Sequence, residues 1–319
     1  MHHEYNVKKR VFANGLCEIR VYQKSVVIGV SSGVSKKTKY EMLDIPFEKE
    51  PVKSRMLQGE LVLDSEGFSI PLVQDNDLIL RKSMKRTQDK VYDYANSNNW
   101  QWFCTFTFSQ DKVNRSDFED VSDKFSQWLW NMRKRYCKDM KYLVVPEKHK
   151  DGSWHFHGLF SNCDGLNFVP AINQAEFFNG KPNKFFGQPL VRNGVQVYDM
   201  KRFKLGFSDC TKVRDTKKVA SYILKYITKE MIADTPNRKR YWISRNLDKP
   251  KETSYCIPLE NYDDFCKDLI QGFAVRNSDV HVNEVHLQHA DFENKITYLK
   301  YDSAKCDIEF SNALFPETS

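Results

Sequence analysis

Residues 143–160, LVVPEKHKDGSWHFHGLF, decide how the centre of this chain folds. Two runs rich in β-branched and aromatic residues flank a turn that contains Asp151 and Gly152, a pattern typical of a β-hairpin. Side chains two residues apart in a strand point to the same face of the sheet. The second strand therefore carries His155 and His157 on one face.

The length of the turn decides whether Glu147 joins the two histidines. A two-residue loop, Asp151-Gly152, would place Glu147 on the opposite face. A three-residue loop that begins at Lys150, with Gly152 left-handed in a G1 bulge, places Glu147 directly across from His155. Only this second register brings the carboxylate and both imidazoles to one face.

Two imidazoles and one carboxylate suit a divalent ion such as Mn²⁺ or Mg²⁺. The second register therefore predicts a metal site at Glu147, His155 and His157. A His-x-His pair by itself is more often one buried, hydrogen-bonded histidine and one at the edge of a sheet. The metal hypothesis thus needs support from other parts of the chain.

The composition is that of a globular protein. The 319 residues are 40% hydrophobic and 13% aromatic, and eight cysteines occur without any CxxC spacing. Scattered cysteines favour reduced thiols in a cytosolic protein over a zinc ribbon or a disulfide framework. There is no run of about 18 apolar residues and no secretory signal in MHHEYNVKKR, so we expect no membrane association.

The net charge of +7 is unevenly distributed. Residues 101–250 hold 27 Lys and Arg against 16 Asp and Glu, whereas residues 251–319 hold 6 against 13. A basic block around the hairpin indicates a polyanionic partner. A solvated basic surface explains the charge equally well.

The coarse secondary structure divides the chain into three regions. Residues 1–80 form a β-rich N-terminal region, residues 81–250 a central domain, and residues 251–319 an acidic C-terminal region. Ser116 and Glu119 have capping-box spacing at the start of one helix. The pattern predicts strands at 17–22, 25–30, 60–63, 69–73, 100–108 and 141–147 and between 279 and 310, helices at 81–97, 116–138, 215–232 and 260–271, and a loop-rich stretch at 161–214.

The helix predicted at 215–232 contains ASYILKYITKE, residues 220–230. Its helical spacing places Tyr222, Lys225, Tyr226 and Lys229 on one face. A free tyrosine titrates near about 10, so it needs nearby cations to act as a nucleophile at neutral pH. Taken alone, an amphipathic helix with surface tyrosines is the more common case.

The strand WFCTFTF, residues 102–108, alternates in the same way. Thr105 and Thr107 face one side, and Phe106 and Phe108 face the other. By itself this is a good β-strand with its phenylalanines in the core.

Taken together and in this order, three segments resemble the motifs of HUH-type rolling-circle replication initiators (Rep proteins). They are FCTFTF (103–108), HFH (155–157) with Glu147 on the preceding strand, and YILKY (222–226). Two tyrosines one turn apart are typical of the two-tyrosine branch found in microviruses, other phages and Gram-positive plasmids. The resemblance covers about residues 95–250, and RYWISRNL (240–247) is also similar to the sequence after the third motif.

The resemblance implies an α+β fold, in which a central antiparallel sheet of about five strands forms an RRM-like palm flanked by helices. It implies a metal-dependent DNA endonuclease and strand transferase. Glu147, His155 and His157 would hold the metal, and Tyr222 or Tyr226 would attack the DNA. Attack leaves a 5′-phosphotyrosine and a free 3′-hydroxyl that primes synthesis, and the second tyrosine would cut the displaced strand. Tyr222 heads the motif and is expected to act first, while Lys225 and Lys229 would stabilise or position the phosphate.

The DNA must be single-stranded at the cut, which calls for basic and aromatic contacts. No phosphate-binding GxxxxGK[ST] motif occurs, so unwinding would come from a host helicase and extension from a host DNA polymerase. The expected location is the cytoplasm of a bacterial host, with origin DNA rather than a small molecule as substrate. The candidate DNA contacts are Thr105, Thr107, Lys201, Arg202, Arg238, Lys239, Arg240 and Trp242.

Three other functions remain open. A relaxase or a transposase would use the same chemistry, although conjugative relaxases tend to carry the tyrosine ahead of the histidines. A non-catalytic single-strand-binding regulator would need the basic block but not the metal ligands and tyrosines together. A metal-dependent hydrolase of small molecules would leave the basic block unexplained.

Overall fold

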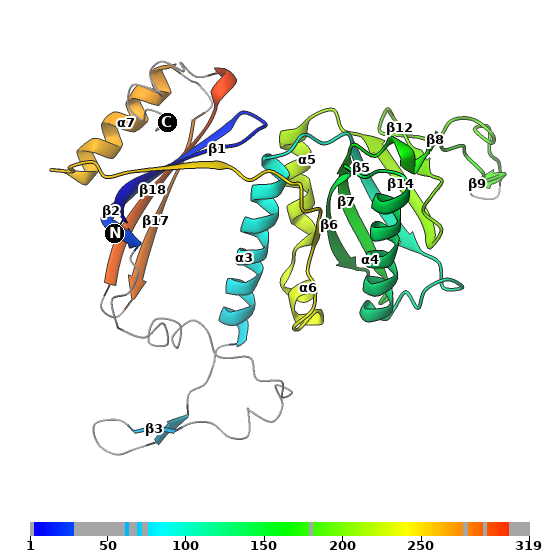
Figure 1. Cartoon of the computed structure of the whole chain (residues 1–319), viewed down its shortest axis with the longest axis horizontal. Helices are drawn as coiled ribbons and strands as arrows, with labels where there is room; N and C mark the ends of the chain where they lie inside the picture. The colour runs from blue at the N-terminus through cyan, green and yellow to red at the C-terminus, as the bar shows by residue number, and fades with distance from the viewer. Residues whose placement is uncertain are drawn as a thin grey trace.

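The computed structural model describes residues 3–28, 61–63, 69–71, 76–178, 181–276, 280–289 and 292–305. They form two antiparallel sheets that lie on either side of the long helix α3 (Asn76–Asn96), as Figure 1 shows. The predicted α+β class is confirmed. In the described part of the chain, no helix is both long and apolar enough to cross a membrane.

The larger sheet has the strand order β15-β6-β7-β5-β14-β13-β8. Four strands of seven or eight residues form its centre, and three strands of two or three residues extend its edges. The sheet is thus somewhat wider than the five strands expected. Its strands are β15 (Trp242–Ile243), β6 (Lys141–Lys148), β7 (Trp154–Ser161), β5 (Trp102–Phe108), β14 (Gly206–Lys212), β13 (Tyr198–Met200) and β8 (Phe168–Pro170).

Helix α4 (Phe118–Arg135) covers one face of this sheet. Its Phe125 packs edge-on against Phe106 and Phe156, which point to this face from β5 and β7. The predicted cap at Ser116 is wrong, because the extended residue before the helix is Asp117, whose carboxylate accepts from the Glu119 backbone N–H. The acidic side chain nearest the free N–H groups caps the helix.

The opposite face is covered by α3, α5 (Thr216–Ile223), the 3₁₀ turn η2 (Leu224–Tyr226) and α6 (Lys229–Asp234). The single helix predicted at 215–232 is therefore wrong. The chain becomes extended at Ile227, and the Thr228 hydroxyl accepts from the Met231 N–H to start a new helix. The break separates Lys229 from the face that carries the two tyrosines.

The stretch predicted as loop-rich, 161–214, contains a central strand that the sequence did not indicate. Strand β14 pairs along its whole length with β5. A Cβ on Gly206 would lie 2.1 Å from the Thr107 carbonyl oxygen, so this close approach requires glycine. The rest of the stretch holds η1 (Asp164–Leu166) and two short hairpins, β9 (Phe177–Phe178) with β10 (Lys181–Pro182) and β11 (Val191–Arg192) with β12 (Val195–Gln196).

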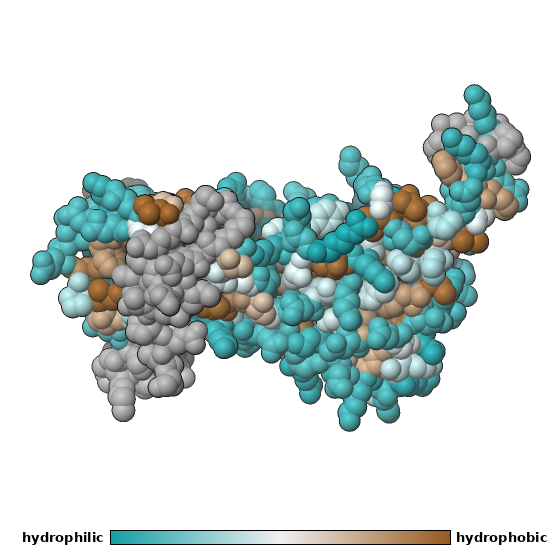
Figure 2. All heavy atoms as spheres, turned by 90° about the horizontal axis from the view of Figure 1, so that it is seen from above, coloured by the Kyte–Doolittle hydropathy of each residue, from teal (hydrophilic) through white to brown (hydrophobic). Residues whose placement is uncertain are grey.

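The hairpin of β9 and β10 stands out from the body of the protein at the right of Figures 1 and 2. Hydrophilic side chains cover most of the face seen in Figure 2, and apolar residues form small separate patches on it. The described part of the protein therefore presents a mainly polar surface on this side.

The second sheet joins the two ends of the chain, with the strand order β16-β1-β2-β18-β17. Helix α7 (Tyr262–Arg276) packs on one face of it. The predicted N-terminal and C-terminal regions thus share one sheet, and parts of the strands predicted at 25–30, 60–63, 69–73 and 279–310 lie outside the described residues. The strands are β16 (Lys251–Tyr255), β1 (His3–Val11), β2 (Leu16–Ile28), β18 (Phe292–Asp302) and β17 (His281–His289), and the remaining elements are the hairpin of β3 (Leu61–Leu63) with β4 (Ser69–Pro71) and the turn η3 (Ser303–Lys305).

A buried ionic network attaches the second sheet to α3. The Arg10 guanidinium, from a residue only 4% exposed, binds Glu18 at 3.1 Å, Glu252 at 3.0 Å and Asp93 of α3. Glu18 also accepts from the Tyr92 hydroxyl of α3 at 2.8 Å. Buried charges are stable only when they are paired in this way, so the network fixes where α3 meets the sheet.

The hairpin of β6 and β7 has the three-residue turn that the metal hypothesis needs. The His149 N–H donates to the Ser153 carbonyl at 2.8 Å, and Gly152 has a φ of +83°. Glu147 lies directly across from His155. The predicted register is confirmed.

Gly152→Ala is expected to lower the free energy of unfolding by about 1 to 2 kcal/mol, because an alanine is strained in the left-handed region. Gly152→Asn is the matched control and should cost less, since asparagine enters that region more readily. Urea denaturation of the three proteins measures the difference. Equal stability of the alanine variant and the wild type would contradict a left-handed Gly152.

Candidate active site

The pairing register aligns side chains in rows across the face that α5 and η2 partly cover. One row runs over β6, β7, β5 and β14 and contains Glu147, His155, Thr107 and Phe207. Directly opposed residues in antiparallel strands point to the same side. A carboxylate, an imidazole, a hydroxyl and a phenyl ring thus lie next to one another. Phe207 was missed from the sequence because β14 was missed.

The two threonines hold the two histidines. The Thr105 hydroxyl lies 3.1 Å from His157 Nδ1, and the Thr107 hydroxyl lies 3.2 Å from His155 Nδ1. Glu147 Oε2 lies 2.7 Å from His157 Nε2. The His157 Nε2–H therefore donates to the carboxylate, and Nδ1 accepts from the threonine hydroxyl. Thr105 and Thr107 were predicted as DNA contacts, but their hydroxyls are directed at the imidazoles.

A third histidine, not predicted, completes the cluster. His149 Nε2 lies 3.4 Å from Glu147 Oε2, and the His149 ring stacks on the His155 ring with centroids 3.7 Å apart. His149 follows Glu147 by two residues. The strand periodicity that placed Glu147 could also have placed His149 on this face.

Burial sets the protonation of the cluster. It lowers the pKa of His155 to about 4 and also lowers the pKa of His157. The hydrogen bond from His157 lowers the pKa of Glu147. At neutral pH both imidazoles are neutral and the carboxylate is charged, which is the state that metal ligation requires.

The chemistry of the donor set fits a divalent ion. A hydroxyl can both donate and accept, so Thr105 and Thr107 can orient either imidazole tautomer and leave Nε2 as the ligand atom. The spacing, however, is that of a hydrogen-bonded cluster. In the part of the chain that the structure describes, no three His, Cys, Asp or Glu side chains are arranged as a ready ligand set. A metal bound by Glu147 and His157 would take the place of their hydrogen bond.

The two tyrosines lie against this cluster and differ from each other. The Tyr226 ring is 7% exposed and stacks on His157 with centroids 3.6 Å apart. Tyr222 is 45% exposed and packs edge-on against Tyr226 and Phe103. Tyr226 is held in place by its contact with His157, and Tyr222 is open to solvent.

Lys225 reaches both tyrosines. Its Nζ lies 3.5 Å from the centroid of the Tyr222 ring and 4.9 Å from that of Tyr226. A hydrogen bond from Lys225 lowers the pKa of Tyr222, whereas burial raises the pKa of Tyr226. The phenol of Tyr222 is therefore the easier one to ionise.

Lys229 does not belong to this group. It begins α6 after the break at Thr228, and its Nζ pairs with Asp77 Oδ1 of α3 at 2.7 Å. The prediction that Lys229 shares a helical face with the tyrosines is wrong because that helix is interrupted.

The candidate DNA contacts near residue 240 have structural partners. Trp242 is 1% exposed and donates from Nε1 to the Ser126 hydroxyl, so its predicted availability for base stacking is wrong. Arg238 binds Glu119 at 2.7 and 2.8 Å. Lys239 lies 5.6 Å from the Trp242 ring, and Arg240 donates to the Ser83 hydroxyl.

Lys201 and Arg202 are not brought to the cluster. Arg202 stacks over the Tyr136 ring at 3.5 Å, at the C-terminal end of α4, and Lys201 pairs with Asp199 at 3.1 Å. Helix α4 covers the other face of the sheet. Arg202 therefore lies on the side away from the histidines, whereas Lys201 is held by Asp199 of β13.

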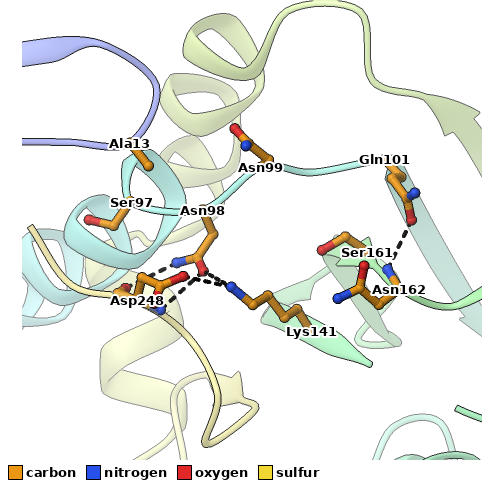
Figure 3. A pocket seen from close by; sticks show the side chains of 9 residues that line it. All are labelled: Ala13, Ser97, Asn98, Asn99, Gln101, Lys141, Ser161, Asn162 and Asp248. Carbon is orange, nitrogen blue, oxygen red and sulfur yellow. Dashed lines mark hydrogen bonds and ion pairs between the residues drawn. The ribbon is translucent and has the colours of Figure 1, made fainter. Parts of the chain in front are cut away.

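Two pockets adjoin the ends of β6. One, of about 260 Å³, lies beside the cluster and is lined by residues that include Glu147, His149, Tyr226 and Thr228. The other, of about 240 Å³, contains Lys141 at the opposite end of the strand. Figure 3 shows this lysine directed at Asn98 and Asp248, which its Nζ contacts at 3.0 and 2.6 Å. The first pocket alone belongs to the candidate active site.

Residues 101–231 match a family model for the replication-associated protein ORF2. The matched segment runs from the start of β5 into α6 and contains the whole cluster of histidines, Glu147 and the two tyrosines. The match supports a role as a replication initiator that interacts with DNA, and it suggests a DNA endonuclease activity. No curated protein and no solved structure matches the chain.

The lowered pKa of His155 predicts a pH-dependent stability in metal-free protein. The unfolded chain takes up a proton near about pH 6.5, whereas the folded chain does so only near pH 4. The folded state therefore loses stability as the pH falls from about 6.5 to about 4. Urea unfolding at several pH values should show a shallower decline for His155→Asn than for the wild type. Parallel curves would contradict a depressed pKa at His155.

Proposed function

We propose that this protein is a rolling-circle replication initiator that nicks one strand of origin DNA with Tyr222. The observation that carries the proposal is the stacking of Tyr226 on His157, which brings the two-tyrosine segment against the cluster of Glu147 and the histidines. Both parts lie within the segment that matches the replication-associated family. Nucleophile and phosphate-binding groups would then act at one place.

Glu147, His155 and His157 would bind the divalent cation, with Thr105 and Thr107 orienting the imidazoles. Bound there, Mn²⁺ or Mg²⁺ would polarise the scissile phosphodiester. Both imidazoles are neutral and the carboxylate is charged at neutral pH. To bind a metal through Nε2, His157 would shift its proton to Nδ1, where the Thr105 hydroxyl can accept it. The threonines would act on the reaction through the histidines.

Tyr222 is the better nucleophile of the pair. It is exposed, and the Lys225 ammonium group stabilises its phenolate. Its oxygen forms a bond to phosphorus while the bond from phosphorus to the 3′ oxygen breaks. The phenolic proton passes to solvent, and the departing oxygen takes up a proton to become the 3′-hydroxyl. The 5′ end stays linked to Tyr222. A host helicase would unwind the duplex, and a host DNA polymerase would extend the free 3′ end.

Tyr226 would act second, on the displaced strand. Its ring is buried and stacked, and burial raises its pKa. Its phenol is therefore less accessible and harder to ionise than that of Tyr222. The two tyrosines would therefore act in a fixed order, even though they are only four residues apart.

Tyr222→Phe should reduce the first covalent adduct by a factor of about 10³ or more, because the nucleophilic oxygen is lost. Tyr226→Phe should retain that adduct. The measurement is a denaturing gel of each protein after incubation with Mn²⁺ and a labelled single-stranded origin oligonucleotide.

An adduct that survives Tyr222→Phe and is lost in Tyr226→Phe would reverse the assignment. Binding of the origin strand without any adduct from the wild type would favour a non-catalytic DNA-binding protein instead.

Thr105→Val and Thr107→Val should each weaken Mn²⁺ binding by about 10- to 100-fold, because the hydroxyl behind each imidazole is removed. Thr211→Val on β14 is the matched control, since Thr211 is paired with Phe103 and not with a histidine. Calorimetric titration of the DNA-free protein with Mn²⁺ gives the affinities. Wild-type affinity in both threonine variants would exclude this role for the hydroxyls.

A further inference from the structure

Phe207 is the most exposed aromatic side chain among the described residues, at 72%. It lies on β14, which is an inner strand between β5 and β13. Side chains of inner strands are usually covered by a helix or a second sheet. Within the described part of the chain the Phe207 ring stacks on no other aromatic ring, and a ring this exposed buries little apolar surface to stabilise the fold.

The position of Phe207 ties it to the candidate active site. It lies directly across from Thr107, whose hydroxyl is 3.2 Å from His155 Nδ1. Two strand spacings separate Phe207 from His155, or about 10 Å. The ring therefore stands on the same face as the imidazoles and within one or two nucleotides of them.

An arginine is held on β14 two residues along the strand from Phe207. Asp209 follows Phe207 by two residues and so points to the same face. Its carboxylate holds Arg192 Nη1 at 2.5 Å, and the Arg192 side chain is 60% exposed. Strand β11 thus supplies a guanidinium group over this part of β14. A guanidinium has five N–H donors, so it can keep Asp209 and still bind a phosphate.

We propose that Phe207 is the stacking platform for an unpaired base next to the scissile phosphodiester, and that Arg192 binds the adjoining backbone phosphate. This proposal rests on the proposed function, because the phosphodiester is placed by the same cluster. Rings that stack bases beside basic side chains are how proteins hold single strands without reading their sequence.

The Phe207 ring would also favour single-stranded over double-stranded DNA. In a duplex the faces of each base are covered by its neighbours, so a ring on the protein gains no stacking contact. Phe207 therefore favours strands that are already unpaired or extruded. Binding energy from the ring would help to hold the unpaired state at the cut.

The test compares two fluorescein-labelled probes of about 16 nucleotides. One is an oligothymidylate, and the other has the same sugar-phosphate backbone without bases. Affinities are measured by anisotropy for the full-length wild type, Phe207→Ala, Phe207→Trp and Arg192→Gln. Trp130→Ala is the matched control, because Trp130 is 55% exposed on α4 at the other face of the sheet. Thermal melts check that each variant is folded.

Phe207→Ala should bind the thymidylate about 5- to 150-fold more weakly, with the abasic probe unaffected. Phe207→Trp should restore the affinity, and Trp130→Ala should match the wild type on both probes. Arg192→Gln should weaken both probes alike, because both carry phosphates.

Wild-type affinity of Phe207→Ala for the thymidylate would overturn the proposal, and so would an equal loss on both probes. An effect of Arg192→Gln on only one probe would overturn the assignment of the phosphate. None of these readings requires cleavage, so the proposal can fail while the adduct assay succeeds, and the adduct assay can fail while stacking is observed.

Discussion

The register of the hairpin between β6 and β7 is the constraint on which the candidate active site depends. Side chains alternate along a strand, so a slip of one residue would turn Glu147 away from His155 and His157. The turn at residues 150–152 prevents this slip because Gly152 takes a conformation that few other residues tolerate. The turn at one end of the hairpin therefore fixes which groups meet on the sheet.

The same alternation joins two sequence segments that look independent. Thr105 and Thr107 are spaced by two residues on β5, and so are His157 and His155 on β7. Antiparallel pairing then matches each hydroxyl to one imidazole. Strand β5, which resembles the first motif, therefore supports the two histidines of the second motif. Its threonine hydroxyls contact both imidazoles at Nδ1.

The parts of the site that could be predicted are those governed by local rules. Strand periodicity was enough to place His155 and His157 on one face, and the α+β class followed from the resemblance. Glu147 joins them only with the three-residue turn, one of two turns that the sequence allowed. The parts that could not be predicted depend on distant contacts or on a choice between close alternatives. Thr228 interrupts a pattern that reads as one helix, because capping a new helix competes with continuing the old one.

Sequence reasoning also failed to predict the burial of Trp242 and the pairing of several strands. Trp242 looked like an exposed ring among basic residues, but its indole reaches Ser126 in the core. Strand β14 carries Gly, Ser, Asp and Lys, which are weak strand formers, and it exists because β5 offers it a full partner. The shared sheet at the two ends of the chain pairs residues nearly the whole length apart, and no local pattern reveals such a pairing.

That shared sheet also fixes the order in which the protein can fold as it is synthesised. The larger sheet is complete once residue 243 has been made, whereas β2 must wait for β18, which ends at Asp302. Until β18 has been made, strand β2 of the hairpin has no partner on one side and presents an unpaired edge. The sheet formed last has the longest-range contacts, which are the slowest to form. On the ribosome, the half of the molecule that holds the histidine cluster is therefore ready before the half that contains the first residues of the chain.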